Sequence, residues 1–287
     1  MYPSLELSPN LYVDRRVALL TQHGKEAVLG EVLGEALACK VERIEGFDTD
    51  TLGTFTRDIA RVGNQLEAAR RKARIGMQLS GLPIGLASEG SFGPDPVTYM
   101  MSYNRELLVW IDDDLGIEVI ATVSGRTNFA SALVASWAEA KHFAERVGFP
   151  QHYLVVRPQH QDYPVFRKGL SDWLAFEHAV AWAMAVAENA QVFIETDMRA
   201  FANPSRMETI RLAAQELAIR LTSYCPVCRA PGFARAEVVK GLPCENCGMP
   251  TAEIKADLLR CVRCGHQQQI ERARQYANAG QCHLCNP

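Results

Sequence analysis

The chain has 287 residues, of which 48% are hydrophobic and 22% are charged, and its formal net charge is -3. This balance is ordinary for a globular protein and excludes global disorder, and the weak negative charge excludes a chain built mainly to coat nucleic acid. No apolar stretch reaches the roughly eighteen residues that a membrane-spanning helix needs. Because no signal peptide is visible either, we predict a cytoplasmic protein with no membrane partner.

The first region, about residues 11–122, alternates strand-like and helix-like segments. Predicted strands are Arg16–Leu20, Val41–Ile44 and Ile84–Ala87, and predicted helices are Lys25–Ala38 and Asp58–Leu79. The Gly/Pro-rich segment Ser88–Pro96 is predicted to be a loop. The runs Leu107–Ile111 and Ile117–Ala121 flank an Asp-Asp-Asp-Leu-Gly segment, which is typical of a hairpin. The alternation indicates an α/β fold with a mixed sheet flanked by helices.

The second region, about residues 128–222, has the same character and could extend the first sheet. Its predicted elements are helices over Asn128–Val147, Asp172–Ala187 and Ser205–Leu221 and strands over Tyr153–Val156 and Gln191–Ile194. We therefore predict one α/β nucleotide-binding-like domain over residues 1–222, or two lobes over about 1–125 and 126–222. A small C-terminal double zinc-ribbon module is predicted over residues 223–287.

Eight of the nine cysteines support that module, because they form four C-x-x-C pairs near the C-terminus. The pairs are Cys225/Cys228, Cys244/Cys247, Cys261/Cys264 and Cys282/Cys285. The gaps between the first and second pairs and between the third and fourth pairs fit the spacing of zinc sites, and disulfides are disfavoured in a reducing compartment. Two structural zinc ions, each held by four thiolates, follow from this spacing.

The pairing of the cysteines stays open, since sequential ribbons and an interleaved cross-brace use the same residues. His266 and His283 lie beside predicted ligands and could substitute, but each would displace a well-placed cysteine. Gly248 and Gly265 each follow a pair, where a zinc knuckle often needs positive φ. The ninth cysteine, Cys39, lies on a helix-like stretch and is expected in the core.

Four features of the α/β part are candidates for ligand binding. Lys72 lies on the same side of its predicted helix as apolar residues. Its side chain therefore either packs along them so that the ammonium group reaches solvent, or it reaches an anion such as phosphate. The segment Thr21–Lys25, with His23, precedes a helix and is either an ordinary turn or an anion site. Ser88 and Glu89 begin the Gly-rich loop. Its glycines either let a ligand approach the backbone closely or only allow a tight turn. Asp197 and Arg199 follow a strand, as in open α/β ligand sites, or form a surface pair beside a helix capped by Ser205.

The first three features together resemble the inosine triphosphate pyrophosphatase family over roughly residues 15–122. Thr21–Lys25 is similar to that family's phosphate loop but one residue shorter, and Glu67–Ala73 with Gly81-Leu82-Pro83 is similar to its helix motif. The segment Ser88–Phe92 looks like the acidic loop of the xanthosine/inosine triphosphatase branch. Ala68 stands where the family has asparagine, and Ser88-Glu89 stands where it has an aspartate pair. The whole chain also looks like an uncharacterised bacterial family with C-terminal zinc ribbons.

The resemblance implies Mg²⁺-dependent hydrolysis of a nucleoside triphosphate with release of pyrophosphate. Glu67 and Glu89 would hold the Mg²⁺, with help from Asp48 or Asp50, and Lys25 and Lys72 would neutralise phosphate charge. Asp197 and Arg199 would line the base or sugar side. The alternative is a non-enzymatic protein whose zinc module binds nucleic acid or a protein partner. Its basic residues are Arg229, Arg235, Lys240, Arg260, Arg263, Arg272 and Arg274.

Overall fold

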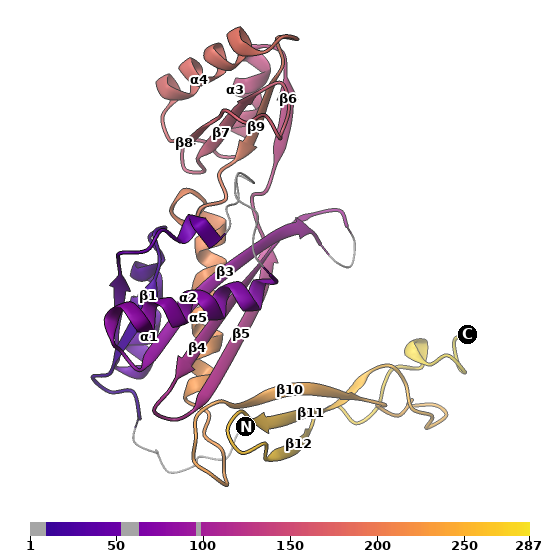
Figure 1. Ribbon diagram of the computed structural model, residues 1–287. Coiled ribbons are helices and arrows are strands. Elements are labelled where there is room, and N and C mark those ends of the chain that lie inside the picture. The colour runs from indigo at the N-terminus through magenta and orange to yellow at the C-terminus, as the bar shows by residue number, and fades with distance from the viewer. Residues whose placement is uncertain (1–9, 53–62, 96–98) are drawn as a thin grey trace. The chain divides into compact units, whose positions relative to one another are not determined.

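The computed structural model describes residues 10–52, 63–95 and 99–287 (Figure 1). The chain divides into two compact units. The first, here called the α/β unit, comprises Leu11–Asp112 and Ile120–Ala218. The second contains Asp113–Val119 and Ile219–Pro287 and includes all eight paired cysteines. Within the described residues, no helix combines the length and the apolar character that crossing a bilayer requires.

The first sheet of the fold has five strands in the order β2-β1-β3-β4-β5. The strands are β1 (Arg16–Leu20), β2 (Lys40–Ile44), β3 (Ile84–Pro94), β4 (Ser102–Asp112) and β5 (Ile117–Arg126). Strand β1 pairs parallel with both β2 and β3, whereas β3 pairs antiparallel with β4. The prediction of a mixed sheet with helices is therefore confirmed.

The helices α1 (Lys25–Leu37) and α2 (Gln65–Ser80) connect the three parallel strands. Helix α2 lies across β3 and β4 (Figure 1), where Ala69, Ala73 and Met77 pack in one buried cluster with residues of both strands. The helix predicted over Asp58–Leu79 begins at Gln65 instead, because the Asn64 side chain accepts hydrogen bonds from the first-turn amides and caps it. The first residues of that prediction lie outside the described part of the chain.

The loop predicted over Ser88–Pro96 is wrong for most of its length, because β3 continues to Pro94 in unbroken register with β4. The glycines of this segment do not mark a turn. A Cβ atom on Gly90 would lie 2.3 Å from Glu106 Oε1 and 2.6 Å from Arg206 Nη2. Gly90 is thus required by the close approach of buried side chains, and Pro94 is tolerated because it stands at the strand's end.

Strands of the second region form a sheet of their own, in the order β6-β9-β7-β8, and do not extend the first sheet. Its elements are β6 (Ser131–Val134), α3 (Trp137–Arg146), β7 (Leu154–Pro158), β8 (Arg167–Leu170), α4 (Trp173–Val186) and β9 (Val192–Thr196). The long helix α5 (Pro204–Leu221) follows. The helix predicted over Asn128–Val147 is wrong in its first part, because β6 there pairs antiparallel with β9 and covers its hydrogen-bonding edge.

The cysteine-rich end forms a three-stranded antiparallel sheet of β10 (Phe233–Lys240), β11 (Ile254–Cys261) and β12 (Gln267–Glu271). Most side chains of β10 and β12 are exposed. Short 3-10 helices occur at η1 (Thr49–Leu52), η2 (Ala200–Ala202) and η3 (Ala279–Gln281). The segment of residues 223–287 is called the cysteine module below.

Candidate functional sites

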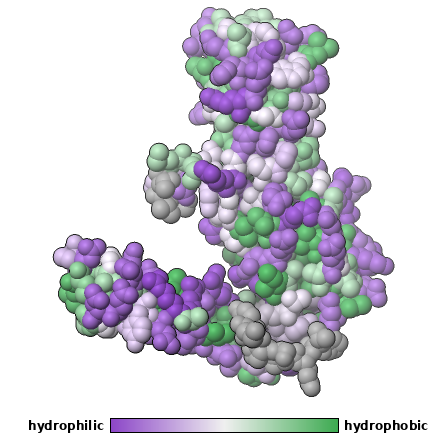
Figure 2. All heavy atoms as spheres, turned by 180° about the vertical axis from the view of Figure 1, so that it is seen from behind, coloured by the Kyte–Doolittle hydropathy of each residue, from purple (hydrophilic) through white to green (hydrophobic). Residues whose placement is uncertain are grey.

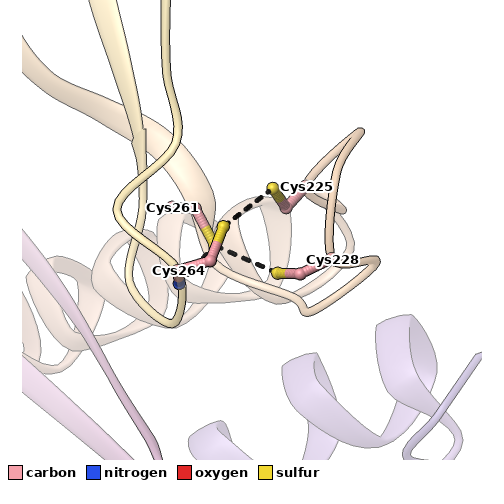
Figure 3. Close-up of side chains that lie close together, drawn as sticks. All are labelled: Cys225, Cys228, Cys261 and Cys264. Carbon is pink, nitrogen blue, oxygen red and sulfur yellow. Dashed lines mark hydrogen bonds between the residues drawn. The ribbon is translucent and has the colours of Figure 1, made fainter.

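The eight paired cysteines gather into two groups of four, and the pairing is interleaved. One group is Cys225, Cys228, Cys261 and Cys264 (Figure 3), and the other is Cys244, Cys247, Cys282 and Cys285. Within each group the sulfur atoms all lie within 4.8 Å of one another. The first and third C-x-x-C turns therefore share a site, as do the second and fourth, which resolves the choice that spacing left open. The neighbouring His266 and His283 belong to neither group.

Sulfur–sulfur distances decide what the groups can hold. Cys225 Sγ lies 3.7 Å from Cys264 Sγ, and Cys228 Sγ lies 3.6 Å from Cys261 Sγ. The corresponding distances in the second group are 3.9 Å and 3.7 Å. These are far longer than a disulfide bond of about 2.05 Å. A tetrahedron with Zn–S bonds of about 2.3 Å has edges of about 3.8 Å, so each group can hold one structural zinc ion.

The knuckle turns have the backbone that this geometry needs. Gly248 and Gly265, which follow the second and third pairs, have φ of 73° and 74°, as expected for a residue after a zinc knuckle. Cys225 and Cys261 are buried in a small cluster with Phe233. The ninth cysteine, Cys39, is buried just after α1, and burial raises the pKa of its thiol to about 11. It is a core residue, as predicted.

Four of the seven basic residues named above for the cysteine module form ion pairs with acidic neighbours. Arg235 and Arg272 both pair with Asp257, Arg260 pairs with Glu237, and Arg274 pairs with Glu253. The surface of the module in Figure 2 is mainly hydrophilic. Paired arginines attract a phosphate backbone weakly, so this arrangement gives little support for nucleic-acid binding.

A small polar cavity lies at the carboxyl end of β1. Its lining is formed by Leu19, Leu20, Thr21, Gln22, His23, Lys25, Thr49, Lys72 and Ser88. Five of these, Thr21, His23, Lys25, Lys72 and Ser88, are candidates from the sequence, and the fold brings them together from β1, α1, α2 and β3. Helix α1 connects β1 to β2, which lies on one side of β1 in the sheet. Helix α2 then connects β2 to β3, which lies on the other side of β1. Ligands of open α/β sheets bind at such a switch point.

Helix α1 begins at this cavity without a capping side chain. Its N-cap residue is Gly24, with φ 70°, and no side chain accepts a hydrogen bond from the first-turn amides. Those amides and the helix dipole favour a negatively charged group. The Thr21 side chain stays close by, because its Oγ1 accepts a hydrogen bond of 3.4 Å from the His23 amide.

Lys25 occupies the first turn of α1 and is only 6% exposed. Its Nζ donates to the Ser88 carbonyl at 2.7 Å and to Ser88 Oγ at 3.3 Å. Burial, helped by the nearby positive charge of Arg206, lowers the pKa of Lys25 to about 7. Burial therefore disfavours the charged form of Lys25. An anion in the cavity would favour that charged form, because it would place a negative charge next to the ammonium group.

The second lysine of the cavity, Lys72, forms an ion pair with the Glu89 carboxylate. Both side chains are largely buried. Successive residues of a strand point to opposite faces, so Ser88 turns toward Lys25 and Glu89 toward α2 and Lys72. The expectation that Lys72 reaches a partner holds, and in this structure the partner is a carboxylate.

Glu67 and Asp48, two of the remaining acidic candidates, are not part of the cavity lining. The Glu67 carboxylate accepts a 2.9 Å hydrogen bond from the Asn64 amide and completes the capping box of α2. Asp48 is exposed after β2, next to the cavity-lining Thr49. The side chain of Asp50 lies outside the described part of the structure. The structure thus brings Glu89 to Lys72 but gives Glu67 a structural partner.

Asp197 and Arg199 bind each other, with Arg199 Nε 3.0 Å from Asp197 Oδ1. Asp197 is buried, so this is not the exposed surface pair considered from the sequence. Asn203, not Ser205, caps α5, because Asn203 Oδ1 accepts from the Arg206 amide at 3.1 Å. The loop between β9 and α5 reaches the cavity through Phe201, whose ring centroid lies 6.1 Å from that of His23.

A buried ion pair next to the cavity was not recognised from the sequence. Arg206 Nε donates to Glu106 Oε1 at 2.7 Å, and both side chains are 1% exposed or less. Ser88 Oγ donates to the other oxygen of Glu106 at 3.2 Å. This network joins α5 to β3 and β4 and fixes Ser88 beside Lys25. Only the tertiary pairing of β3 with β4 places these residues together, so no local pattern could have revealed them.

Comparison with known proteins gives one match. Residues 72–287 match a family described as Domain of unknown function, DUF6671. No curated protein and no solved structure matches the chain. These findings add no support for the resemblance to the inosine triphosphate pyrophosphatase family. The match covers both cysteine groups, Lys72 and the strands β3 to β9, so the chain belongs to the DUF6671 family.

Proposed function

We propose that the cavity at the end of β1 binds the phosphate groups of a nucleotide and that the protein is a nucleoside triphosphate pyrophosphohydrolase. The observation that carries the proposal is the meeting of Lys25 and Lys72 at the uncapped start of α1. Two ammonium groups, first-turn amides and the hydroxyls of Thr21 and Ser88 form a donor set suited to phosphate oxygens. The zinc ions of the cysteine module serve stability in this proposal.

Binding of a phosphate would change the partner of Lys72. Glu89 neutralises Lys72 in this structure. A phosphate oxygen competes for the same ammonium group and leaves the Glu89 carboxylate beside the bound phosphate. That carboxylate then accepts a proton from a water molecule whose oxygen attacks the α-phosphorus. As this P–O bond forms, the bond between the α-phosphorus and the oxygen bridging to the β-phosphorus breaks, and pyrophosphate leaves with that oxygen. Lys25 and Lys72 stabilise the charge that develops on the phosphate oxygens.

The described residues do not form a dedicated magnesium site. Among them, the groups of three or more potential metal ligands are the two cysteine groups alone. Glu67 is used as a helix cap, and the side chain of Glu106 is buried against Arg206. A Mg²⁺ ion would therefore depend mainly on the substrate phosphates for its ligands. The Glu67 carboxylate accepts from the Asn64 amide and the Glu89 carboxylate pairs with Lys72, so magnesium binding by these two residues stays a prediction.

The test is pyrophosphate release from a panel of canonical and deaminated nucleoside triphosphates, with and without added Mg²⁺. We expect the wild type to cleave at least one member, and Glu89→Gln to lose about 100-fold or more of the rate, as for a general base. Glu45→Gln is the control, because Glu45 has a 76% exposed side chain after β2. Equal background rates in all three proteins would refute the hydrolase.

A further inference from the structure

The loop between β9 and α5 places aromatic side chains directly beside the phosphate cavity. Phe201 is 44% exposed. Its Cβ lies 3.5 Å from the position that a Cβ would take on Gly24, the N-cap of α1. His23, which lines the cavity, has its ring centroid 6.1 Å from that of Phe201. The Phe201 ring thus lies next to His23, which lines the proposed phosphate site.

The surroundings of Phe201 hold its ring in place. The Arg199 guanidinium lies over it, 4.8 Å from the ring centroid, and is itself fixed by the buried carboxylate of Asp197. The Tyr153 ring meets Phe201 edge-on, with centroids 6.1 Å apart and an angle of 75°. Gly169 leaves room for this arrangement, because a Cβ there would lie 2.9 Å from Arg199 Nη2. A fixed, partly exposed ring is a suitable surface for stacking.

We propose that Phe201 stacks on the base of the nucleotide whose phosphates occupy the cavity. This inference rests on the proposed phosphate site, and it extends the ligand from a phosphate group to a complete nucleotide. A nucleotide joins its base to its phosphates through one sugar, so neighbouring sites for each are what such a ligand requires. Base stacking on an aromatic ring tolerates different bases. Phe201 therefore supplies affinity for a base, and selection among bases rests on other groups.

Binding of two ligands to the full-length protein tests the inference. Isothermal titration compares tripolyphosphate, which has no base, with a non-hydrolysable nucleoside triphosphate analogue. We expect Phe201→Ala to lower the affinity for the nucleotide analogue about tenfold or more and to leave the affinity for tripolyphosphate unchanged. Phe201→Trp is expected to keep nucleotide affinity. Tyr276→Ala, which removes an exposed ring of the cysteine module, is the control and should change neither ligand.

The outcomes separate this inference from the proposed function. If Phe201→Ala weakens both ligands equally, or if the wild type binds both equally, the stacking role is refuted and the phosphate site stands. If neither ligand binds the wild type, the phosphate site and the stacking role fail together. Tight nucleotide binding that depends on Phe201, without any pyrophosphate release, would support stacking and refute the hydrolase.

Discussion

The cysteine module and the α/β unit reach a defined structure by different physical means. The module has a mostly exposed sheet and a small buried cluster around Cys225, Phe233 and Cys261. The α/β unit has two larger apolar clusters and a buried ion pair. We therefore expect the stability of the module to depend on metal ligation, whereas that of the α/β unit depends on burial.

The largest expected effect is the loss of zinc from paired cysteine variants. With interleaved sites, Cys244→Ser combined with Cys282→Ser damages one site and leaves one zinc per chain. Cys225→Ser combined with Cys244→Ser damages both sites and leaves none. Elemental analysis of the purified proteins measures the number of zinc ions per chain. Cys39→Ser is the control and should keep two zinc ions per chain. Sequential pairing would reverse the two results.

Structural zinc contributes about 10–16 kcal/mol of apparent binding free energy in small zinc domains at pH 7. We expect a chelator to unfold the cysteine module while the α/β unit keeps its helices. Hydrogen exchange should show lost protection in β10, β11 and β12 and unchanged protection in α2. Equal loss in both regions would contradict the contrast between them.

The next effect concerns the buried ion pair of the α/β unit. Arg206→Met leaves the Glu106 carboxylate buried without its cation, which should lower the free energy of unfolding by about 3–5 kcal/mol. Arg211→Met is the matched control on the same helix, because Arg211 pairs with the half-exposed Glu31. Its cost should be about 1 kcal/mol or less. Denaturant unfolding measures both, and equal costs would show that burial does not dominate.

A smaller loss is expected where β3 approaches the ion pair. Gly90→Ala introduces a Cβ that overlaps Glu106 and Arg206, and overpacking of this kind typically costs about 1–3 kcal/mol. Gly93→Ala, three residues along the same strand, has no neighbouring atom within 4 Å of the added Cβ. Thermal unfolding should therefore separate the two variants. Equal melting temperatures would mean that the side chains rearrange freely.

A further effect is a pH dependence of stability that arises from Lys25. Its pKa is lowered to about 7 in the folded protein by burial, whereas an unfolded lysine has a pKa of about 10.4. Between these values the unfolded chain binds the additional proton, so the free energy of unfolding rises with pH by up to about 1.4 kcal/mol per unit. Below pH 7 this contribution is constant at its least favourable value.

The Lys25→Met variant should lack that rise, and Lys40→Met, at an exposed position of β2, should retain it. Denaturant unfolding between pH 7 and 9 measures the difference. Sulfate, whose charge is constant in this range, should bind the wild type more weakly as the pH rises because Lys25 loses its proton. A sulfate affinity that does not change with pH would show that Lys25 is not a ligand of the anion.

The sequence revealed what depends on local pattern. The C-x-x-C spacing identified all eight ligands of the two groups, and hydrophobic runs located β1, α1, β2, α4 and β9 to within about two residues of their ends. The pairing of the cysteines was hidden, because both arrangements satisfy the same spacing. The extent of β3 was hidden too, since glycines required by Glu106 and Arg206 have the same local appearance as loop glycines.

The cavity shows a mixed result. Thr21, His23 and Lys25 were identified from their place between a strand and a helix, and that place is local. Lys72 was suspected from its position among apolar residues of α2. Phe201 and the Glu106–Arg206 pair carried no local signal, because their significance arises only when α5 packs against β3 and β4. Glu67 was misleading, since a carboxylate three residues after Asn64 also completes a capping box.

The most direct measurement is a crystal structure of the protein with a non-hydrolysable nucleoside triphosphate analogue. The proposal predicts phosphate oxygens at the start of α1, within hydrogen-bonding distance of Lys25 Nζ and Lys72 Nζ, with the Lys72–Glu89 pair broken. A nucleotide bound elsewhere, or an unchanged cavity with that ion pair intact at saturating ligand, would contradict it.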